Sequence, residues 1–228
     1  MPSILFIHQG FPAQFKHIIT YLDQTQNYNL YAVGLSNRDP SWSSSIKYFK
    51  YSISRGNSND ANQYISDFET KTIRAEACAD LLFHLKKSGL QPDLIYGHPG
   101  WGECLFVKDI WPNTPLLCYQ EFFYNTVGFD YQFDPEFQDL RSWQDSAIVR
   151  TKMANCLMSL NIADWNIVPT NFQLSTFPHV YHHQFSVIHD GIDINISHPF
   201  DCNAELPSLS GLNIPSDVPV ISFVNRTI

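Results

Sequence analysis

The sequence predicts an α/β fold in which helices cover both faces of a Rossmann-like, doubly wound and mostly parallel sheet. Short apolar runs alternate with longer stretches of helical periodicity, which is the pattern of such a sheet. The first apolar run, residues 3–7, lies almost at the start of the chain, the usual place for a first central strand. The chain has 228 residues, of which 44% are hydrophobic and 16% charged, enough for a globular domain with its own core.

The expected elements follow one another in a regular order. Strands are expected at residues 3–7, 30–35, 48–53, 93–96, 115–119, 165–168 and 185–188. Helices are expected at residues 13–22, 61–87, 139–162 and 172–177, with a shorter one between the fourth and fifth strands. The strand at 48–53 alternates between apolar and polar residues and is placed at an edge of the sheet. Right-handed crossovers between these strands then give a mostly parallel arrangement.

The C-terminal part of the sequence departs from this pattern. Residues 198–217 are rich in Pro, Ser and Asn and read as a linker. Residues 218–224 have the composition of one more buried strand, followed by four residues. We therefore expect a Rossmann-like domain at residues 1–197, a linker at 198–217 and the start of a truncated second domain at 218–228.

Composition and charge exclude several classes of function. The 22 acidic and 14 basic residues give a net charge of -8, which argues against a nucleic-acid partner. No apolar stretch approaches the ~20 residues of a membrane span, and the N-terminus lacks the features of a signal peptide, so a cytoplasmic protein without a transmembrane segment is expected. The five cysteines are widely spaced and predict core thiols. The histidines at 179, 182 and 183 lack acidic or cysteine partners at ligand spacing, so no metal site is expected.

Residues for which a buried strand has no structural use follow the carboxyl ends of three expected strands. They are His8, Gln9 and Gly10 after the first strand, His98, Trp101 and Glu103 after the fourth, and Gln120 and Glu121 after the fifth. In open α/β sheets ligands bind at this edge, because the loops there are free of core packing and helix N-termini point toward it. The sequence therefore predicts a binding cleft at this edge.

Several of these residues have a structural alternative. His8 either hydrogen-bonds a neutral ligand or satisfies local backbone groups, and His98 either faces the cleft or caps the helix that follows it. Trp101 is either a stacking platform or a packing residue. The aromatic loop at residues 122–137 is either a packed lid or the wall of a sugar site. The turn after the first strand contains Gly10 but no G-x-G-x-x-G motif, which disfavours a dinucleotide oxidoreductase.

Five blocks of sequence, taken together and in order, resemble a known family. They are HQGFPAQF, YGHPGWGE, PTNFQLSTFP, SVIHDGID and FVNRTI. They look like the N-terminal half of a glycosyltransferase family 4 enzyme of GT-B architecture, and the resemblance covers nearly the whole chain. It implies two Rossmann-like domains facing each other across a cleft. The N-terminal one would bind a sugar or glycan acceptor and the C-terminal one a UDP- or GDP-sugar donor, with transfer that retains the anomeric configuration and needs no dinucleotide cofactor.

The resemblance also implies roles for individual residues. Gly10 occupies the place of the family's glycine-containing loop, and Arg226 matches the start of the Arg-plus-Lys pair that clamps the donor diphosphate. Glu121 falls at or next to a place where many relatives carry a histidine, which is a departure from the family pattern. The implied site residues are Glu121 and His98 as catalytic groups, His8, Gln9, Gly10, Trp101 and Glu103 as acceptor-binding groups, and Arg226 as the donor-phosphate ligand.

Two readings of the function follow from the resemblance. The Lys of the diphosphate clamp and the family's Glu-rich donor motif do not occur in these 228 residues, and both stabilise charge on the leaving group. We therefore expect the polypeptide alone to be inactive, as the acceptor-side half of an enzyme that needs a complementing C-terminal half. The alternative is a non-catalytic carbohydrate-binding or regulatory module with the same fold.

Overall fold

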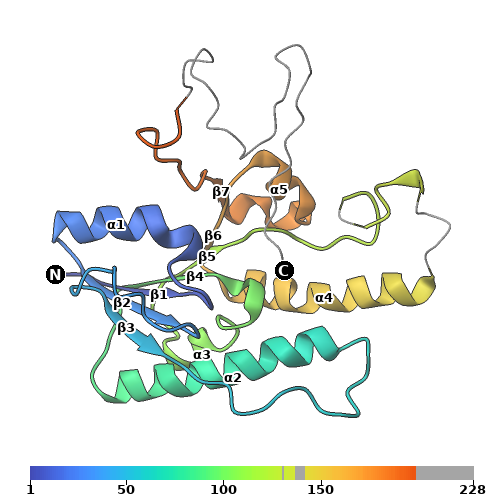
Figure 1. Ribbon diagram of the computed structural model, residues 1–228. Coiled ribbons are helices and arrows are strands. Elements are labelled where there is room, and N and C mark those ends of the chain that lie inside the picture. Colours follow the sequence, from blue (N-terminus) through green and yellow to red (C-terminus); the bar gives the residue numbers. More distant parts are fainter. Residues whose placement is uncertain (130, 137–141, 199–228) are drawn as a thin grey trace, which may run out of the picture. The chain divides into compact units, whose positions relative to one another are not determined.

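The computed structural model describes residues 1–129, 131–136 and 142–198 (Figure 1). Its centre is a sheet of seven strands in the order β3-β2-β1-β4-β5-β6-β7, and every neighbouring pair is parallel. The strands are β1 (Ser3–Ile7), β2 (Asn29–Gly34), β3 (Lys47–Lys50), β4 (Leu94–Gly97), β5 (Leu116–Tyr119), β6 (Trp165–Val168) and β7 (Phe185–Val187). The predicted parallel α/β sheet is confirmed, and β3 lies at an edge as expected.

Helices connect most of these strands. They are α1 (Lys16–Thr25), α2 (Ser66–Lys87), α3 (Val107–Ile110), α4 (Trp143–Ile162) and α5 (Asn171–Thr176), with short 3-10 turns at Ala13–Phe15, Pro99–Trp101 and His179–Gln184. No helix in the part of the chain that the structure describes is long and apolar enough to cross a membrane.

The core has two layers, one on each face of the sheet. Along β1 the side chains alternate, so that Phe6 packs with Phe15 and Ile19 on the face covered by α1. Leu5 and Ile7 belong to the opposite layer together with residues of α2 and α3. Figure 1 shows α1 and α2 on opposite sides of the strands. Burial on both faces explains why the strands read as continuous apolar runs.

Three helices start later than the sequence-based expectation, and one of them is α4, which was expected from residue 139 and begins at Trp143. The helix expected from residue 61 begins at Ser66, because Asn62 forms a local turn in which its side chain accepts from the Tyr64 amide at 3.0 Å and its carbonyl from the Ile65 amide at 2.9 Å. The helix expected at residues 13–22 is split into a 3-10 turn and the later α1. The Thr170 hydroxyl caps α5 by accepting from the Gln173 amide.

Other expectations concern the cysteines and the C-terminal part. Cys78, Cys104, Cys118 and Cys156 are buried free thiols, as predicted. Residues 1–191 form one compact unit, and residues 192–228 belong to a second. The expected domain boundary at residue 197 stays a prediction. Several sequence-based expectations lie outside the described residues. They concern Cys202, Arg226, the strand expected at residues 218–224 and all of the expected linker except His198.

A glycine turn brings the loop after β4 against the backbone of α2. Gly102 has a φ of +106°, and a Cβ atom placed there would lie 2.2 Å from the carbonyl oxygen of Lys71. No side chain fits at that distance, because both groups are backbone-anchored. This contact fixes the loop of residues 98–103 relative to α2.

We predict that Gly102→Ala lowers the free energy of unfolding more than Gly89→Ala does, although both glycines have a positive φ. Gly89 has a similar φ of +96°, and a Cβ atom added there would meet open space, with nothing beyond its own chain neighbours within 4 Å. Gly89→Ala should cost about 1–2 kcal/mol for the left-handed backbone, and Gly102→Ala a further ~1–3 kcal/mol for overpacking. Urea unfolding of both variants measures the difference. Equal losses of unfolding free energy would contradict the close contact.

Candidate functional site

A groove of about 290 Å³ lies at the carboxyl ends of β4 and β5, bordered by α2 and α4. We call it the α2–α4 groove. Its strand-end wall contains His98, Trp101 and Glu121, and its helical wall contains Lys71 and Asn155. The cleft predicted at this edge of the sheet is therefore present, and it is bordered by helical side chains that sequence reasoning did not single out.

His98 is buried, with a hydrogen bond at one ring nitrogen and a contact to Glu121 at the other. Its Nδ1 atom accepts from the Gly100 amide at 3.2 Å, which caps the 3-10 turn after β4. Its Nε2 atom lies 3.3 Å from Oε2 of Glu121. Because Nδ1 carries the accepting lone pair, the neutral ring bears its proton on Nε2, toward Glu121. The capping alternative is thus realised, and the same ring also positions the carboxylate.

The carboxylate of Glu121 lines the groove and is restrained by contacts with two side chains. Its side chain is 45% exposed, with Oε2 beside His98 and Oε1 accepting from the Gln14 side-chain amide. Contact with His98 lowers the pKa of Glu121 more than partial burial raises it. The carboxylate is therefore ionised at neutral pH and restrained by two partners. Gln14 was missed by sequence reasoning, because nothing in the spacing of residues 14 and 121 indicates that they meet.

His8 lies behind His98 and does not line the groove. The two rings are 4.8 Å apart, and His8 Nδ1 accepts from the Gly10 amide at 2.9 Å. Burial, reinforced by the neighbouring His98, lowers the pKa of His8 to about 4, so the ring is neutral at physiological pH. The local-backbone alternative for His8 is therefore realised. Gln9 and Gly10 are likewise absent from the groove lining, so the structure does not bring them to the cleft.

Glu103 was expected to face the same cleft, and this expectation was wrong. Its side chain is 1% exposed and accepts a hydrogen bond from the Tyr51 hydroxyl at 2.5 Å. The left-handed turn at Gly102 directs the chain inward after Trp101, which places Glu103 beneath the loop. Burial raises the pKa of this carboxyl. Glu103 therefore supports the loop from the interior.

Trp101 and the aromatic loop do contribute to the wall of the groove. Trp101 is 43% exposed and lies 5.7 Å from the Arg74 guanidinium, which is a cation–π distance. In the following loop Phe122 and Tyr124 line the groove. Phe123 between them is buried, with its ring 5.6 Å from that of Phe177. The packed alternative is therefore confirmed for Phe123, and the role of the loop as the wall of a sugar site stays a prediction.

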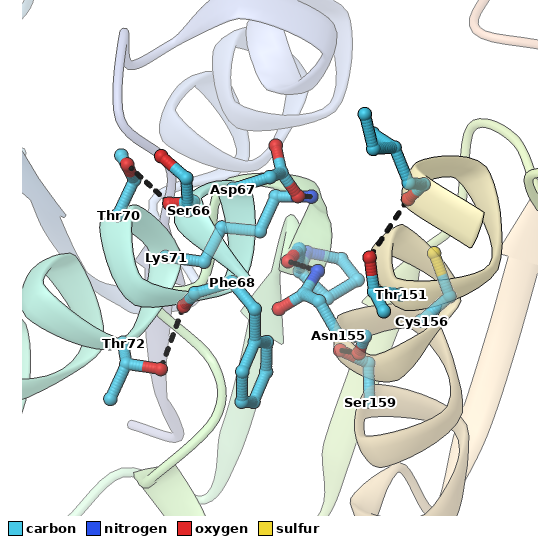
Figure 2. Close-up of polar contacts among 12 residues, drawn as sticks. Ser66, Asp67, Phe68, Thr70, Lys71, Thr72, Thr151, Asn155, Cys156 and Ser159 are labelled. Carbon is cyan, nitrogen blue, oxygen red and sulfur yellow. Dashed lines mark hydrogen bonds and ion pairs between the residues drawn. The ribbon is translucent and has the colours of Figure 1, made fainter. Parts of the chain in front are cut away.

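The helical wall consists of polar residues that no sequence pattern singles out. Asp67 and Lys71 come from successive turns of α2, and Asn155 and Ser159 from α4, as Figure 2 shows. Lys71 is only 5% exposed and Asn155 1%. The spacing of Asp67 and Lys71 is that of a surface ion pair on a helix. Only the packing of α2 against α4 reveals that Lys71 and Asn155 are buried.

The groove offers an ionised carboxylate, a buried ammonium, an amide and aromatic rings, a combination that suits a small ligand carrying hydroxyl groups. Among residues 1–129, 131–136 and 142–198, no group of three His, Cys, Asp or Glu side chains could hold a metal ion. In the histidine cluster before β7, the rings of His179 and His182 stack with their centres 4.3 Å apart.

The fold and the groove define a Rossmann-like domain of the kind found in GT-B glycosyltransferases. A model of the glycosyl transferase family 4 group matches residues 26–197, which is more than half of the chain. The chain therefore belongs to the glycosyl transferase family 4 group, and the predicted family is confirmed. A search of curated protein sequences found no match.

Solved glycosyltransferases share the fold. UGT2 of Phytolacca americana, in complex with UDP-2fluoro-glucose and pterostilbene, has a TM-score of 0.51 at 12% identity, covering 76% of this chain and 48% of that one. A UDP-glucosyltransferase of Polygonum tinctorium capable of glucosylating indoxyl, in complex with 3,4-dichloroaniline, has a TM-score of 0.50 at 9% identity, covering 82% and 52%. This chain thus spans about half the length of these structures, and the likeness shows the fold alone.

We predict that the buried, neutral His8 makes stability pH-dependent. The pKa of His8 is about 4 in the folded domain against 6.5 in the unfolded chain, so the unfolded state binds more protons between these values. Folding stability is then lost as the pH falls, by about 1.5 kcal/mol between pH 6.5 and pH 5. Urea unfolding of wild type and His8→Asn at both pH values measures this contribution.

In His8→Asn the side-chain oxygen still accepts from the Gly10 amide, so the variant should lose some stability at every pH but show a flatter pH dependence. The exposed His17 serves as the control, and His17→Asn should keep the wild-type slope. If wild type and His8→Asn lose the same free energy between pH 6.5 and pH 5, burial of a neutral His8 is refuted.

Proposed function

We propose that this chain forms the acceptor-side domain of a glycosyltransferase that moves a sugar from a nucleotide-sugar onto a hydroxyl group, with retention of configuration. The observation that carries the proposal is the ionised Glu121 carboxylate, held by His98 and Gln14 at the mouth of the α2–α4 groove. Membership of the glycosyl transferase family 4 group supplies the reaction class. The position of the groove at the carboxyl edge of a parallel sheet agrees with where α/β domains bind ligands.

Glu121 is the residue that we assign to the acceptor hydroxyl. Its lowered pKa makes it a weak base toward an alcohol, so it acts mainly by holding the hydroxyl in place and stabilising the positive charge that develops on the hydroxyl oxygen. The hydroxyl proton would leave with the nucleoside diphosphate. His98 is a positioning residue in this scheme, because one ring nitrogen accepts from the Gly100 amide and the other contacts Glu121. This revises the expectation that His98 is itself a catalytic group.

The donor would be a UDP- or GDP-sugar held largely by a second domain. Support comes from the span of the chain, which is about half that of the two glycosyltransferase structures with the same fold. Arg226 is the proposed ligand for the donor phosphates, since a guanidinium stabilises a leaving diphosphate by charge-assisted hydrogen bonds. Without that second domain, residues 1–228 would not catalyse transfer. A cytoplasmic location is part of the same proposal.

A non-catalytic carbohydrate-binding module is the second candidate. It is favoured by the fact that the α2–α4 groove is built wholly within residues 1–191. Such a module would bind a sugar with no donor present and would show no transfer under any condition.

Nucleotide release separates the two candidates. The chain is incubated with UDP- and GDP-sugars and candidate acceptors, alone and with a donor-side domain of the same family added in trans, and free UDP or GDP is quantified. Release that depends on both polypeptides and on an acceptor supports the transferase. Sugar binding by the chain without release in any mixture supports the binding module.

We predict that Glu121→Gln lowers kcat by about 100-fold in whichever assembly shows transfer, because the amide keeps the shape but cannot stabilise the positive charge that develops on the hydroxyl oxygen. Glu121→Ala should be at least as slow. Glu76→Gln is the control: Glu76 pairs with Arg55 on an exposed surface and is predicted to leave kcat unchanged. Steady-state kinetics measure all three, and wild-type turnover in both Glu121 variants would remove this residue from the reaction.

A further inference from the structure

The deep end of the α2–α4 groove contains two buried polar side chains that the proposed reaction does not use. Lys71 on α2 and Asn155 on α4 both line the groove, with exposures of 5% and 1%. A lysine and an asparagine are seldom buried to this extent without a specific partner. Figure 2 shows the two side chains extending from their helices into the space between α2 and α4.

The side-chain amide of Asn155 has a hydrogen-bond partner at its nitrogen but none at its oxygen among the described residues. Its Nδ2 group donates to the Pro99 carbonyl at 3.0 Å, which fixes the orientation of the amide. Its Oδ1 atom is buried and has no hydrogen-bond partner among the described residues. A buried acceptor of this kind is unfavourable unless a ligand or water donates to it. The geometry therefore leaves one acceptor for a group that carries a hydrogen.

Lys71 supplies donors in the same groove. Its Nζ atom is 2.8 Å from Oδ2 of Asp67 and 5.8 Å from the centre of the Tyr124 ring. An ammonium group has three donor positions, and Asp67 takes one of them. A hydroxyl group can accept from Lys71 and donate to Asn155 at once, whereas a fully ionised anion can only accept. The donor and acceptor together match a hydroxyl.

The charges of the groove also disfavour an anionic ligand. The carboxylate of Asp67 neutralises Lys71, and the carboxylate of Glu121 stands at the strand-end wall of the same groove. A phosphate or carboxylate group would be repelled by these two negative charges. Arg74 adds a positive charge, but it lies against the Trp101 ring. The four ionised side chains in the groove therefore sum to no net charge.

We propose that Lys71 and Asn155 determine acceptor specificity by binding hydroxyl groups of a neutral, monosaccharide-sized ring. The inference rests on the proposed function, because it identifies the acceptor of that same site. One face of the ring would lie against Trp101 or Tyr124, as sugar rings do on aromatic side chains, while its reacting hydroxyl meets Glu121. The volume of about 290 Å³ accommodates a single ring of this size.

Binding by the chain itself tests the proposal without any transfer reaction. Residues 1–228 are titrated by NMR with glucose, galactose, mannose and myo-inositol, and in parallel with glucose 6-phosphate and glucuronate. At least one neutral ring should bind more tightly than its anionic counterparts. Lys71→Met keeps the aliphatic stem but removes the donors, and it should weaken that binding at least tenfold. Lys87→Met, a change on an exposed lysine of the same helix, should have no effect.

Trp101→Ala provides a second variant on a partly exposed wall, which keeps the proposal testable if Lys71→Met fails to fold. It should also weaken binding of the neutral ring. Unchanged affinity in both variants, tighter binding of the anionic sugars, or no binding of any neutral ring would overturn the inference. These outcomes differ from failure of the proposed function, which would appear as neutral-sugar binding sensitive to Lys71 but no nucleotide release in any mixture.

Discussion

The parallel arrangement of β1, β4 and β5 is the constraint on which the site depends. Because the three strands are neighbours in register and point the same way, Ile7, Gly97 and Cys118 come side by side near their carboxyl ends. The residues that follow are therefore brought together from three distant parts of the chain. His98 meets both His8 and Glu121 without any sequence proximity. A single reversed strand would send one of these groups to the far edge of the sheet.

Electrostatic interactions among His8, His98 and Glu121 determine which of these side chains carries a charge. His8 and His98 are too close for both rings to be charged in a buried site, and burial keeps His8 neutral. Glu121, half exposed, gains a lower pKa from His98 and so carries the negative charge where solvent and ligand reach it. The interior thus holds the neutral His8 ring, and the negative charge of Glu121 stands at the surface of the groove. This arrangement fixes a carboxylate without the cost of burying it.

The sheet could be predicted well from the sequence because buried parallel strands are continuous apolar runs. The strand predicted at residues 165–168 has the observed ends, and the polar residues after β4 and β5 mark a cleft, as predicted. The prediction for Glu103 failed because a single residue, Gly102 in the left-handed region, turns the loop away from the groove. Lys71 and Asn155 could not be found, since each reads as an ordinary polar position on a helix. Their burial arises only when α2 packs against α4.

The two walls of the groove have different origins, which in the proposed function would separate the residues of the reaction from those of acceptor recognition. The strand-end wall, with His98 and Glu121, is held by the register of the sheet and by caps such as that from His98 to Gly100. The helical wall, with Lys71 and Asn155, is held by the packing of α2 against α4 and not by the register of the strands. If the groove binds an acceptor as proposed, substitutions on α2 and α4 would change the hydroxyl pattern that it accepts while the Glu121 carboxylate stays in place. On this argument, the acceptor range of related chains should vary with the helical residues and not with the strand-end pair.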